Sequence, residues 1–364
     1  MVLLYVFGAV ALINCAYYLL FSKFSFLKPT EKVVSVKHPV SLIVCAKNEA
    51  ENLKKHIPLW QQQDYPEYQI ILINDASIDD TLEVMESFAD SDPRIQIVNV
   101  RNNEAFWGNK KYALTLGLKR SVNTRLIFTD ADCYPASNKW LERMATRFTD
   151  QKQLLLGYGA YEKQPGLLNK LIRFETLMTA VQYFSYAEAG TPYMGVGRNL
   201  AYTSTLYYEN NGFMSHIKFP SGDDDLFVNE AATKDNVEIC VEPEAFTYSI
   251  PKKKFSSWIK QKKRHYSTAK LYKTTHRFLL GAYYLFNLLF WLLGAATLFT
   301  EFWILGLVII FIRLAFQHLI IGYAAKKLKE QDLIPFILFF ELFLIFSQLS
   351  IFISNRGEKN PRWK

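Results

Sequence analysis

The chain has 364 residues, of which 50% are hydrophobic, and its formal net charge is +8. It can therefore bury one sizeable domain and still have apolar sequence left over, and this surplus lies at its two ends. The four cysteines are far apart and form no CxxC pair, which excludes the usual patterns of a zinc site or a disulfide framework and suits a reducing compartment.

The first predicted element is an apolar helix at the N-terminus. Met1 to Phe21 contains no charged residue and is long enough to span a membrane. Cys15-Ala16 is followed by the bulky residues Tyr17, Tyr18 and Leu19 rather than by a small-residue cleavage site, so residues 1–22 are predicted to be an anchor and not a signal peptide. Basic residues follow at Lys23, Lys28, Lys32 and Lys37. By the positive-inside rule, they predict that the central domain is cytoplasmic.

Residues 38–250 are predicted to form one α/β domain. Short apolar runs typical of buried strands occur at Ser41–Ala46, Ile70–Ile73, Ile95–Val98 and Arg125–Phe128. The amphipathic stretches between them predict helices at Glu49–Gln62, Asp79–Phe88 and Lys110–Lys119. This alternation predicts a mostly parallel sheet with helices on both faces. Beyond Asp150 the pattern is mixed, with a strand predicted at Leu154–Tyr161 and a helix near Leu167–Tyr186.

Polar residues follow three of the predicted strands, at the edge where such sheets bind ligands. They are Lys47-Asn48-Glu49, Asn74-Asp75-Ala76-Ser77 and Thr129-Asp130-Ala131-Asp132. The last group is the most informative, because a chain that turns at the end of a strand can aim both acids of Asp-x-Asp at one hard cation. Alone, this pattern is more often an Asp-rich turn. The coincidence of three polar strand ends favours a site for a metal-bound diphosphate.

Two charged clusters follow. Gly222-Asp223-Asp224-Asp225-Leu226 puts three like charges together, which is costly unless one is solvated and another has a use. The alternative is an acidic first turn of a helix at Leu226–Ala232. Lys252 to Arg277 contains ten Lys or Arg and no acid. Nucleic acid would suit such a run, but anionic lipid is favoured directly before an apolar span.

Residues 251–277 are accordingly predicted to form an amphipathic helix at the membrane interface, with Phe255, Trp258 and Ile259 on its apolar face. Residues 278–355 are predicted to be membrane helices. The apolar stretches are Phe278–Phe299, Trp303–Ala325 and Leu333–Ser354.

The topology of these stretches contains one conflict. The basic loop Lys326–Lys329 suits the cytoplasm, but a fourth span would place the basic tail Arg356–Lys364 outside. Leu333–Ser354 is therefore either a span that overrides the rule or a re-entrant or interfacial segment. Among the few internal charges, Arg313 and His318 are candidates to contact a lipid headgroup, and the alternative for Arg313 is a structural pair with Glu341.

Taken together, the motifs form a known series. They are Ala46-Lys47-Asn48-Glu49, Asn74-Asp75-Ala76-Ser77, Gly108-Asn109-Lys110-Lys111-Tyr112-Ala113-Leu114, Asp130-Ala131-Asp132, Gly222-Asp223-Asp224-Asp225-Leu226 and Gln261-Lys262-Lys263-Arg264-His265. In this order they resemble the motifs of the membrane-bound family 2 glycosyltransferases, which have a GT-A catalytic domain. The resemblance covers about residues 40–265, and its strength lies in the order of the motifs.

The resemblance implies how a nucleotide-sugar donor would be held. Asp75 would accept a hydrogen bond from the base, Glu49 would support the base or ribose, and Lys110 would lie near the diphosphate. Asp130 would face the ribose, and Asp132 would hold a Mg²⁺ or Mn²⁺ ion that bridges the diphosphate. From the residues alone, Asp75 is also explained as a helix cap and Lys110 as a surface lysine.

The resemblance also implies the catalytic groups. Asp224, the second acid of its motif, would be the catalytic base that takes the proton from the acceptor hydroxyl. Arg264 would contact the diphosphate or the acceptor-side pocket. His265 stands where the family usually has Trp, a residue that helps polymer synthases to hold a growing sugar chain. This departure and the small number of spans weaken the case for a polysaccharide acceptor.

The expected function is therefore the inverting transfer of a single sugar from a nucleotide-diphosphate sugar to a lipid acceptor. A UDP-sugar is the favoured donor. We expect an integral protein of the plasma membrane that acts at the cytoplasmic face and has no nucleic-acid partner. The alternatives are a polysaccharide-synthase-like transferase and a non-catalytic receptor for nucleotide sugars, although a receptor would not need the acid cluster. Nucleotidyl transfer usually begins with a Gly-rich loop after the first strand, which Ala46-Lys47-Asn48-Glu49 lacks.

Overall fold

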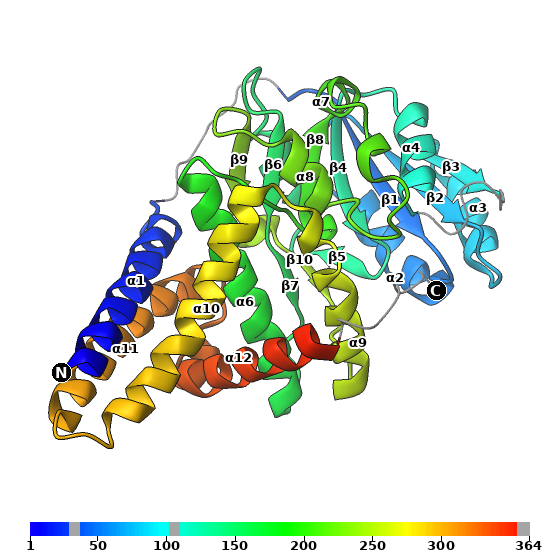
Figure 1. Ribbon diagram of the computed structural model, residues 1–364. Coiled ribbons are helices and arrows are strands. Elements are labelled where there is room, and N and C mark those ends of the chain that lie inside the picture. Colours follow the sequence, from blue (N-terminus) through cyan, green and yellow to red (C-terminus); the bar gives the residue numbers. More distant parts are fainter. Residues whose placement is uncertain (29–36, 102–109, 355–364) are drawn as a thin grey trace. The chain divides into compact units, whose positions relative to one another are not determined.

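The computed structural model of the protein describes residues 1–28, 37–101 and 110–354. Lys32, the motif residues Gly108 and Asn109, and the basic tail from Arg356 lie outside these ranges. The chain forms two compact units (Figure 1). Of the described residues, the α/β unit contains 37–101, 110–164 and 190–252, and the helical unit contains Met1–Lys28, Pro165–Ala189 and 253–354.

The α/β unit is built on a seven-stranded sheet of order β3-β2-β1-β4-β8-β6-β9. The strands are β1 (Val40–Ala46), β2 (Tyr68–Asp75), β3 (Ile95–Val100), β4 (Arg125–Asp130), β6 (Leu154–Gly157), β8 (Leu200–Thr203) and β9 (Val237–Cys240). The strands β3, β2, β1 and β4 run parallel to one another, and β8 is antiparallel to both β4 and β6. The mostly parallel sheet that the sequence predicts is thus confirmed.

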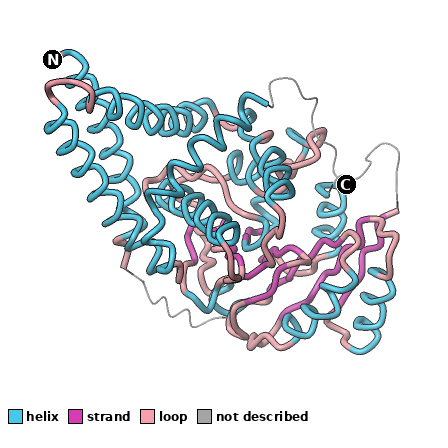
Figure 2. The backbone as a smooth tube through the Cα atoms, turned by 90° about the horizontal axis from the view of Figure 1, so that it is seen from below, coloured by secondary structure: helices cyan, strands magenta, loops and turns pink. Residues whose placement is uncertain are grey.

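Helices and short turns connect the strands and flank the sheet (Figure 2). The helices of this unit are α2 (Ala50–Gln61), α3 (Thr81–Ser91), α4 (Lys110–Arg120), α5 (Trp140–Ala145), α7 (Ser204–Glu209) and α8 (Asp225–Ala231). The short 3-10 turns are η2 (Gly197–Asn199), η3 (Met214–His216) and η4 (Pro243–Ala245).

Alternating side chains explain why both faces of the sheet are covered. Leu42 and Leu72 belong to the buried core that also contains Leu53 of α2 and Met85 of α3. Successive residues of a strand point to opposite faces. Their neighbours Ile43 and Ile73 accordingly face α4, where a Cβ on Gly117 would lie only 2.2 Å from Cδ1 of Ile73. The missing side chain lets α4 lie close to the sheet.

A smaller sheet of order β5-β10-β7 follows the acidic end of β4. Its strands are β5 (Cys133–Pro135), β7 (Gly159–Tyr161) and β10 (Thr247–Ser249). The prediction of one strand at Leu154–Tyr161 is wrong, because the chain changes sheets at Tyr158: β6 pairs with β8 and β9, whereas β7 pairs with β10. The period of apolar residues does not reveal such a change of partner.

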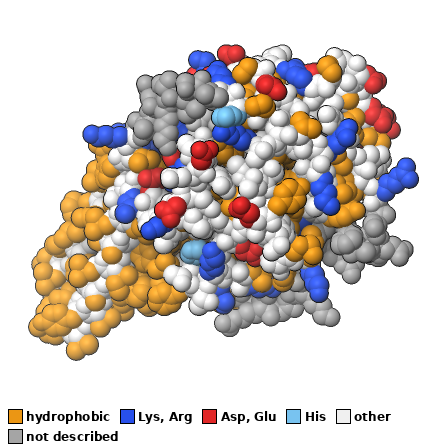
Figure 3. Space-filling model, turned by 90° about the horizontal axis from the view of Figure 1, so that it is seen from above, with side chains coloured by type: hydrophobic (Ala, Val, Ile, Leu, Met, Phe, Trp, Pro, Cys, Tyr) orange, Lys and Arg blue, Asp and Glu red, His pale blue; other side chains and the backbone are white. Residues whose placement is uncertain are grey.

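The helical unit contains the apolar ends of the chain. Its helices are α1 (Val2–Ser25), α6 (Leu167–Glu188), α9 (Phe255–Tyr266), α10 (Thr274–Thr297), α11 (Trp303–Lys327) and α12 (Ile337–Ser354), with the short turns η5 (Ala269–Leu271) and η6 (Gln331–Phe336). In the part of the chain that the structure describes, four segments are long and apolar enough to cross a membrane: α1, α10, α11 and the run Gln331–Ser354. Hydrophobic side chains cover much of the surface of this unit (Figure 3).

A buried polar network joins these four helices around Arg313. Its guanidinium has an exposed fraction of 0% and forms an ion pair with Glu341 of α12. Nη1 donates to Oε2 of Glu341 at 2.8 Å, and Nη2 donates to Asn287 Oδ1 of α10 at 2.5 Å. Tyr18 of α1 donates to Oε1 of Glu341 at 3.2 Å. Of the two alternatives for Arg313, the geometry favours the structural pair.

The sequence-based domain range 38–250 differs from the observed units in one segment, α6. Residues 165–189 group with the helical unit. Two kinds of contact hold α6 there: Phe184 stacks on Phe24 of α1 with ring centroids 4.9 Å apart, and the almost fully buried Arg173 pairs with Glu330 and Asp332, whose Oδ2 accepts from Nη1 of Arg173 at 2.9 Å.

Helix α9 also packs on its own unit through one face. Its buried lysine, Lys262, forms an ion pair with Glu175 of α6, and Phe255 packs on Phe343 of α12 with ring centroids 5.9 Å apart. Trp258 has an exposed fraction of only 1%. The expectation that Trp258 faces the headgroup layer is therefore wrong, since its side chain is covered by protein, whereas Phe255 keeps an exposed fraction of 46%.

Candidate active site

Three strand ends meet at one edge of the large sheet. β1 lies between β2 and β4, with Ala46 opposite Asn74 and Cys45 opposite Asp130. Since all three strands are parallel, their carboxyl ends share an edge. The polar groups that follow β1, β2 and β4 in the sequence are therefore neighbours in space, as the sequence predicts.

The first two of these loops are tied together by hydrogen bonds. Asn48 has a positive φ of 57°, donates its backbone N–H to Ser77 Oγ at 3.0 Å and accepts from the N–H of Ile78 at 2.9 Å. The backbone N–H of Glu49 donates to Thr81 Oγ1 at 2.9 Å. These bonds make one rigid rim, because neither loop can move without breaking contacts to the other.

Asp75 and Glu49 both lie on this rim. Asp75 is the last residue of β2, and its Oδ2 lies 4.0 Å from Nζ of Lys47. Burial raises its pKa, and the charges of Lys47 and Lys110 oppose that rise. Glu49 accepts from Asn52 Nδ2 at 2.6 Å, and burial raises its pKa as well. The helix-cap alternative for Asp75 fails, since Asp79 accepts from the N–H of Thr81 at 3.1 Å instead.

The acidic pair lies at the turn from β4 into β5. Ligand atoms of Asp130, Asp132 and Cys133 lie within 4.8 Å of one another. Burial and the charge of Asp130 raise the pKa of Asp132, whose Oδ1 accepts from the Cys133 thiol at 3.4 Å. Burial also raises the pKa of Cys133, which keeps its sulfur protonated. Two carboxylates beside a thiol suit a hard cation such as Mg²⁺ or Mn²⁺, with the aspartates as ligands.

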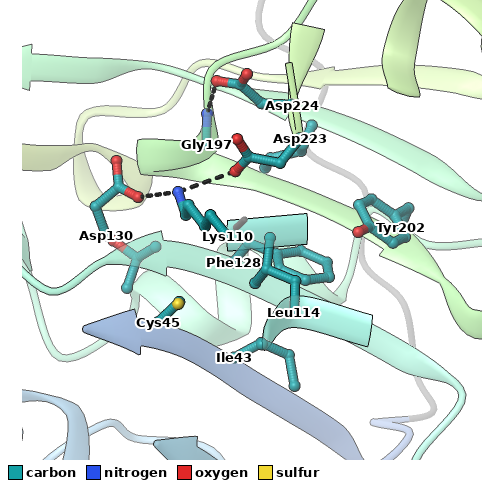
Figure 4. Close-up of a pocket in the computed structure, with 12 residues that line it drawn as sticks. Ile43, Cys45, Lys110, Leu114, Phe128, Asp130, Gly197, Tyr202, Asp223 and Asp224 are labelled. Carbon is teal, nitrogen blue, oxygen red and sulfur yellow. Dashed lines mark hydrogen bonds and ion pairs between the residues drawn. The ribbon is translucent and has the colours of Figure 1, made fainter. Parts of the chain in front are cut away.

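Lys110 connects the acidic pair to the second acid cluster. Its Nζ lies 2.8 Å from Asp130 Oδ1 and 2.9 Å from Asp223 Oδ2 (Figure 4). Burial lowers the pKa of Lys110, but the charges of the two aspartates outweigh this and raise it well above its usual range. Burial on its own would raise the pKa of Asp223, but the charge of Lys110 and its hydrogen bond hold that pKa below its usual range. Lys110 is therefore no ordinary surface lysine.

Asp224 lies beside this ion pair at the start of α8. Its Oδ1 accepts from the N–H of Asp225 at 2.7 Å, and its Oδ2 accepts from the N–H of Gly197 at 2.7 Å (Figure 4). Burial and the charges of Asp223 and Asp225 raise its pKa to about 7. Asp224 is thus also the N-cap of α8, as the alternative interpretation of this acidic cluster has it. Capping a helix does not require a carboxylate with a pKa near neutrality.

A single pocket joins these groups. It is lined by Lys110, Asp130, Gly197, Asp223 and Asp224, and its apolar wall includes Leu114, Phe128 and Tyr202. The pocket thus places a cation between acids at one side and a carboxylate of raised pKa at the other. Such a pairing is able to bind a phosphate group beside a proton acceptor.

Comparison with known proteins gives the family. Residues 41–200 match the model of the family described as Glycosyl transferase family 2. The chain contains a family 2 glycosyltransferase domain. It is 30% identical over 106 residues to Glycosyltransferase AglE of Haloferax volcanii, a match that covers 29% of this chain and 33% of that protein. An uncharacterized glycosyltransferase of Haemophilus influenzae is 25% identical over 199 residues, or 53% of this chain and 60% of that protein.

A solved structure shows the same fold, the mannosyltransferase PcManGT from Pyrobaculum calidifontis in complex with GDP-Man and Mn²⁺. Its superposition on this chain has a TM-score of 0.57 and a sequence identity of 16%. The match covers 93% of this chain and 99% of that one. The family 2 domain thus has the GT-A fold that the sequence predicts. The matches span less than two thirds of the length of both curated relatives.

In the α/β unit, the structure gathers most of the expected residues at one edge of the sheet. Asp75, Glu49, Lys110, Asp130, Asp132 and Asp224 all belong to the α/β unit. Arg264 does not, because it lies in the last turn of α9 in the helical unit. Its proposed contact with the diphosphate stays a prediction.

Two residues of the family 2 domain were missed by sequence reasoning. His56 of α2 places Nδ1 2.9 Å from the carbonyl oxygen of Ala131, between the two aspartates of the acidic pair. Arg198 lies 4.3 Å over the ring of Tyr161, and its charge lowers the pKa of Asp132. The Gly-rich segment that contains Arg198 is visible in the sequence, but only the fold brings it beside Asp132.

Proposed function

We propose that the protein is an inverting glycosyltransferase that moves a single sugar from a nucleotide-diphosphate sugar to a membrane lipid at the cytoplasmic face. The observation that carries this proposal is the pocket in which Lys110 bridges Asp130 and Asp223 while Asp224 has a pKa of about 7. A base with a pKa near the working pH is suited to general-base catalysis. A receptor that only binds a nucleotide sugar does not need such a group.

In this proposal Asp224 takes the proton of the acceptor hydroxyl as that oxygen attacks the anomeric carbon. The new bond joins the acceptor oxygen to the sugar, and the bond from the anomeric carbon to the diphosphate oxygen breaks. The electron pair of that bond leaves with the nucleoside diphosphate. One displacement of this kind inverts the configuration of the sugar. The N–H of Gly197, which donates to Asp224 at 2.7 Å, fixes the orientation of the base.

The donor would lie along the rim of the sheet. Asp75 and Glu49 are the candidates to bind the base and ribose, and Asp130 is the candidate to face the ribose. Asp132 would hold the divalent cation, which would neutralise diphosphate charge as the leaving group departs. Lys110 would exchange a contact with Asp130 or Asp223 for one with a phosphate oxygen. The presence of GDP-Man and Mn²⁺ in PcManGT supports a nucleotide sugar and a metal without deciding the base.

The lipid acceptor is supported by the helical unit. Its four apolar segments are long enough to cross a membrane, and three lysines in or before α9 are exposed: Lys253, Lys254 and Lys260. These cations suit an anionic membrane surface. Arg313 is fully buried and paired with Glu341, which supports a structural role for this charge rather than contact with a growing glycan.

The experiment is a comparison of lipid products. Membranes that contain the protein or its Asp224→Asn variant are supplied with a panel of UDP-, GDP- and other nucleotide sugars, and lipid extracts are examined by mass spectrometry. The proposal predicts one lipid that gains the mass of one sugar residue with the parent protein only. A ladder of sugar additions would favour the polysaccharide alternative. Unchanged lipids together with tight donor binding would favour the receptor.

A further inference from the structure

The two adjacent lysines at the start of α4 have different partners. Lys110 contacts the carboxylates of the pocket, as described above. Lys111 is fully buried, with an exposed fraction of 0%, and its Nζ donates to the carbonyl oxygens of His216 at 2.8 Å and Phe219 at 3.2 Å. One turn of helix therefore touches both the acid pair and a distant stretch of chain.

That stretch, residues 213–221, leads directly into the acid cluster. It lies between Gly212, with a φ of 58°, and Gly222, with a φ of 96°. A Cβ on Gly222 would lie 2.4 Å from Cδ1 of Leu226, so the sharp turn into Asp223 requires glycine. The position of the 213–221 segment thus determines where α8 begins, and with it where Asp223 and Asp224 lie.

The segment is held by several contacts. At its start, the buried ring of Phe213 packs on Tyr207 of α7 and Phe227 of α8, with ring centroids 5.1 and 5.8 Å apart. On its exposed side, Ser215 donates to Glu230 of α8 at 2.7 Å. That bond ties the segment only to the helix that follows it. On its buried side, the ammonium group of Lys111 ties it to α4, the helix that also carries Lys110. Hydrogen bonds from a charged donor to buried carbonyl oxygens are stronger than those between neutral groups.

Burial of this lysine is costly, which argues that its contacts matter. Burial lowers the pKa of Lys111 to about 8, and the charges of Asp223, Asp225 and Asp224 oppose that change. A buried ammonium persists only when carbonyl oxygens and nearby acids replace its lost water. Here both kinds of partner belong to the chain that forms the acceptor side of the pocket.

We propose that Lys111 is a positioning residue, which pins the 213–221 segment to α4 and thereby fixes the distance between Lys110 and the acids Asp223 and Asp224. This inference rests on the proposed sugar transfer, since it assigns Lys111 a part in aligning the base with the donor. It makes α4 the element that sets both sides of the pocket. Lys111 itself touches neither the donor nor the acceptor.

The test uses Lys111→Met in the full-length protein, because Met keeps most of the stem and removes the ammonium group. Lys119→Met is the matched control, since Lys119 is an exposed lysine on the same helix. Lys111→Arg restores the donors and should recover part of any loss. Three quantities are measured for each: amide hydrogen exchange of residues 213–221, affinity for a nucleoside diphosphate with Mn²⁺, and turnover.

We expect Lys111→Met to speed exchange in the 213–221 segment and to lower turnover by on the order of 10- to 100-fold, as misalignment of reacting groups does. Affinity for the nucleoside diphosphate should change by less than about threefold, because Lys111 does not touch the donor. A merely structural lysine would weaken binding and turnover together.

Two results would overturn the inference. One is unchanged exchange in the 213–221 segment, and the other is faster exchange with turnover equal to that of Lys119→Met. The proposed function fails separately, if Asp224→Asn keeps full turnover. In that case the exchange measurement still decides whether Lys111 pins the segment.

Discussion

At the scale of single residues, the ionisation of Asp224 sets the expected pH dependence. Burial and the charges of Asp223 and Asp225 raise its pKa to about 7, so the carboxyl is protonated below that pH and cannot accept a proton from an acceptor. Turnover should therefore fall about tenfold for each pH unit below the pKa and level off above it. The measurement is the turnover number between about pH 5 and 9.

Asp225→Asn is the control for this prediction. The variant removes a negative charge that raises the pKa of Asp224, so the acid limb of its profile should move to lower pH. A profile that stays flat down to pH of about 5 would exclude Asp224 as the titrating base.

Asp132 is the residue on which metal binding should depend. Asp132→Asn keeps the shape of the side chain but removes the anionic oxygen that a hard cation needs. We expect the variant to lose the Mn²⁺-dependent part of its affinity for a nucleoside diphosphate. Calorimetric titration with and without Mn²⁺ measures this, with Asp64→Asn in the same unit as the control. An unchanged effect of Mn²⁺ would remove Asp132 from the metal site.

Single residues were predictable where they end a parallel strand. Asp75 and Asp130 are the last residues of β2 and β4, so an apolar run followed by an acid was enough to find them. Arg198 and His56 were not predictable, since their contacts to the acidic turn join segments far apart in the sequence. The partners of Lys111 were hidden for the same reason.

At the scale of elements, α9 combines a packed face with an exposed basic one. Trp258 and Lys262 are buried, whereas Lys253, Lys254 and Lys260 are exposed. If the exposed lysines meet anionic headgroups, each contributes about 1 kcal/mol near the surface. Changing all three to Glu should abolish any rise of turnover with the fraction of anionic lipid.

The control for α9 is the triple variant of exposed lysines in the α/β unit, Lys55→Glu, Lys119→Glu and Lys234→Glu, which makes the same change in net charge. Both variants are compared in vesicles with and without anionic lipid. Equal sensitivity to lipid in the two variants would show that net charge, and not α9, is responsible. Background hydrolysis of the nucleotide sugar should be unaffected in both.

The sequence predicted the type of α9 but not its orientation. Phe255, Trp258 and Ile259 form an apolar stripe, which suits a lipid surface and a protein surface equally well. The structure favours protein for Trp258, which is buried, and Glu175 of α6 pairs with Lys262 one turn later, whereas Phe255 stays exposed. A buried ion pair across two helices leaves no trace in the local pattern.

At the scale of the whole molecule, the apolar helices depend on one buried charge pair. Arg313 and Glu341 join α11 to α12, and Asn287 adds α10. Arg313→Met should destabilise the helical unit by about 3–5 kcal/mol, because it leaves the Glu341 charge without a partner. Thermal unfolding in detergent measures this effect.

The double variant Arg313→Met and Glu341→Leu is the control for that prediction. It removes both charges, so it should recover most of the lost stability. A double variant as unstable as Arg313→Met alone would show that the apolar replacements, and not the unpaired charge, cause the loss. The buried pair would then not be what holds the apolar helices together.

The overall architecture was largely predictable because the patterns of its two parts occupy different regions of the sequence. Alternating strands and helices indicated the α/β fold, and long uncharged stretches indicated the apolar helices. The division into two units was harder to predict from the sequence. α6 lies inside the predicted range 38–250, yet it groups with the helical unit, where its Arg173 pairs with Glu330 and Asp332 and its Phe184 stacks on Phe24.

The most direct test of the account is the effect of Asp224→Asn on the full-length protein in lipid membranes. Donor affinity and turnover are measured on the same preparation, with the sugar nucleotide and lipid identified by the product screen. We predict a donor affinity within about threefold of the parent and a turnover lower by a factor on the order of 10² or more, as expected for loss of a general base. Turnover within a few-fold of the parent would contradict the account, because Asp224 could not then be the group that deprotonates the acceptor.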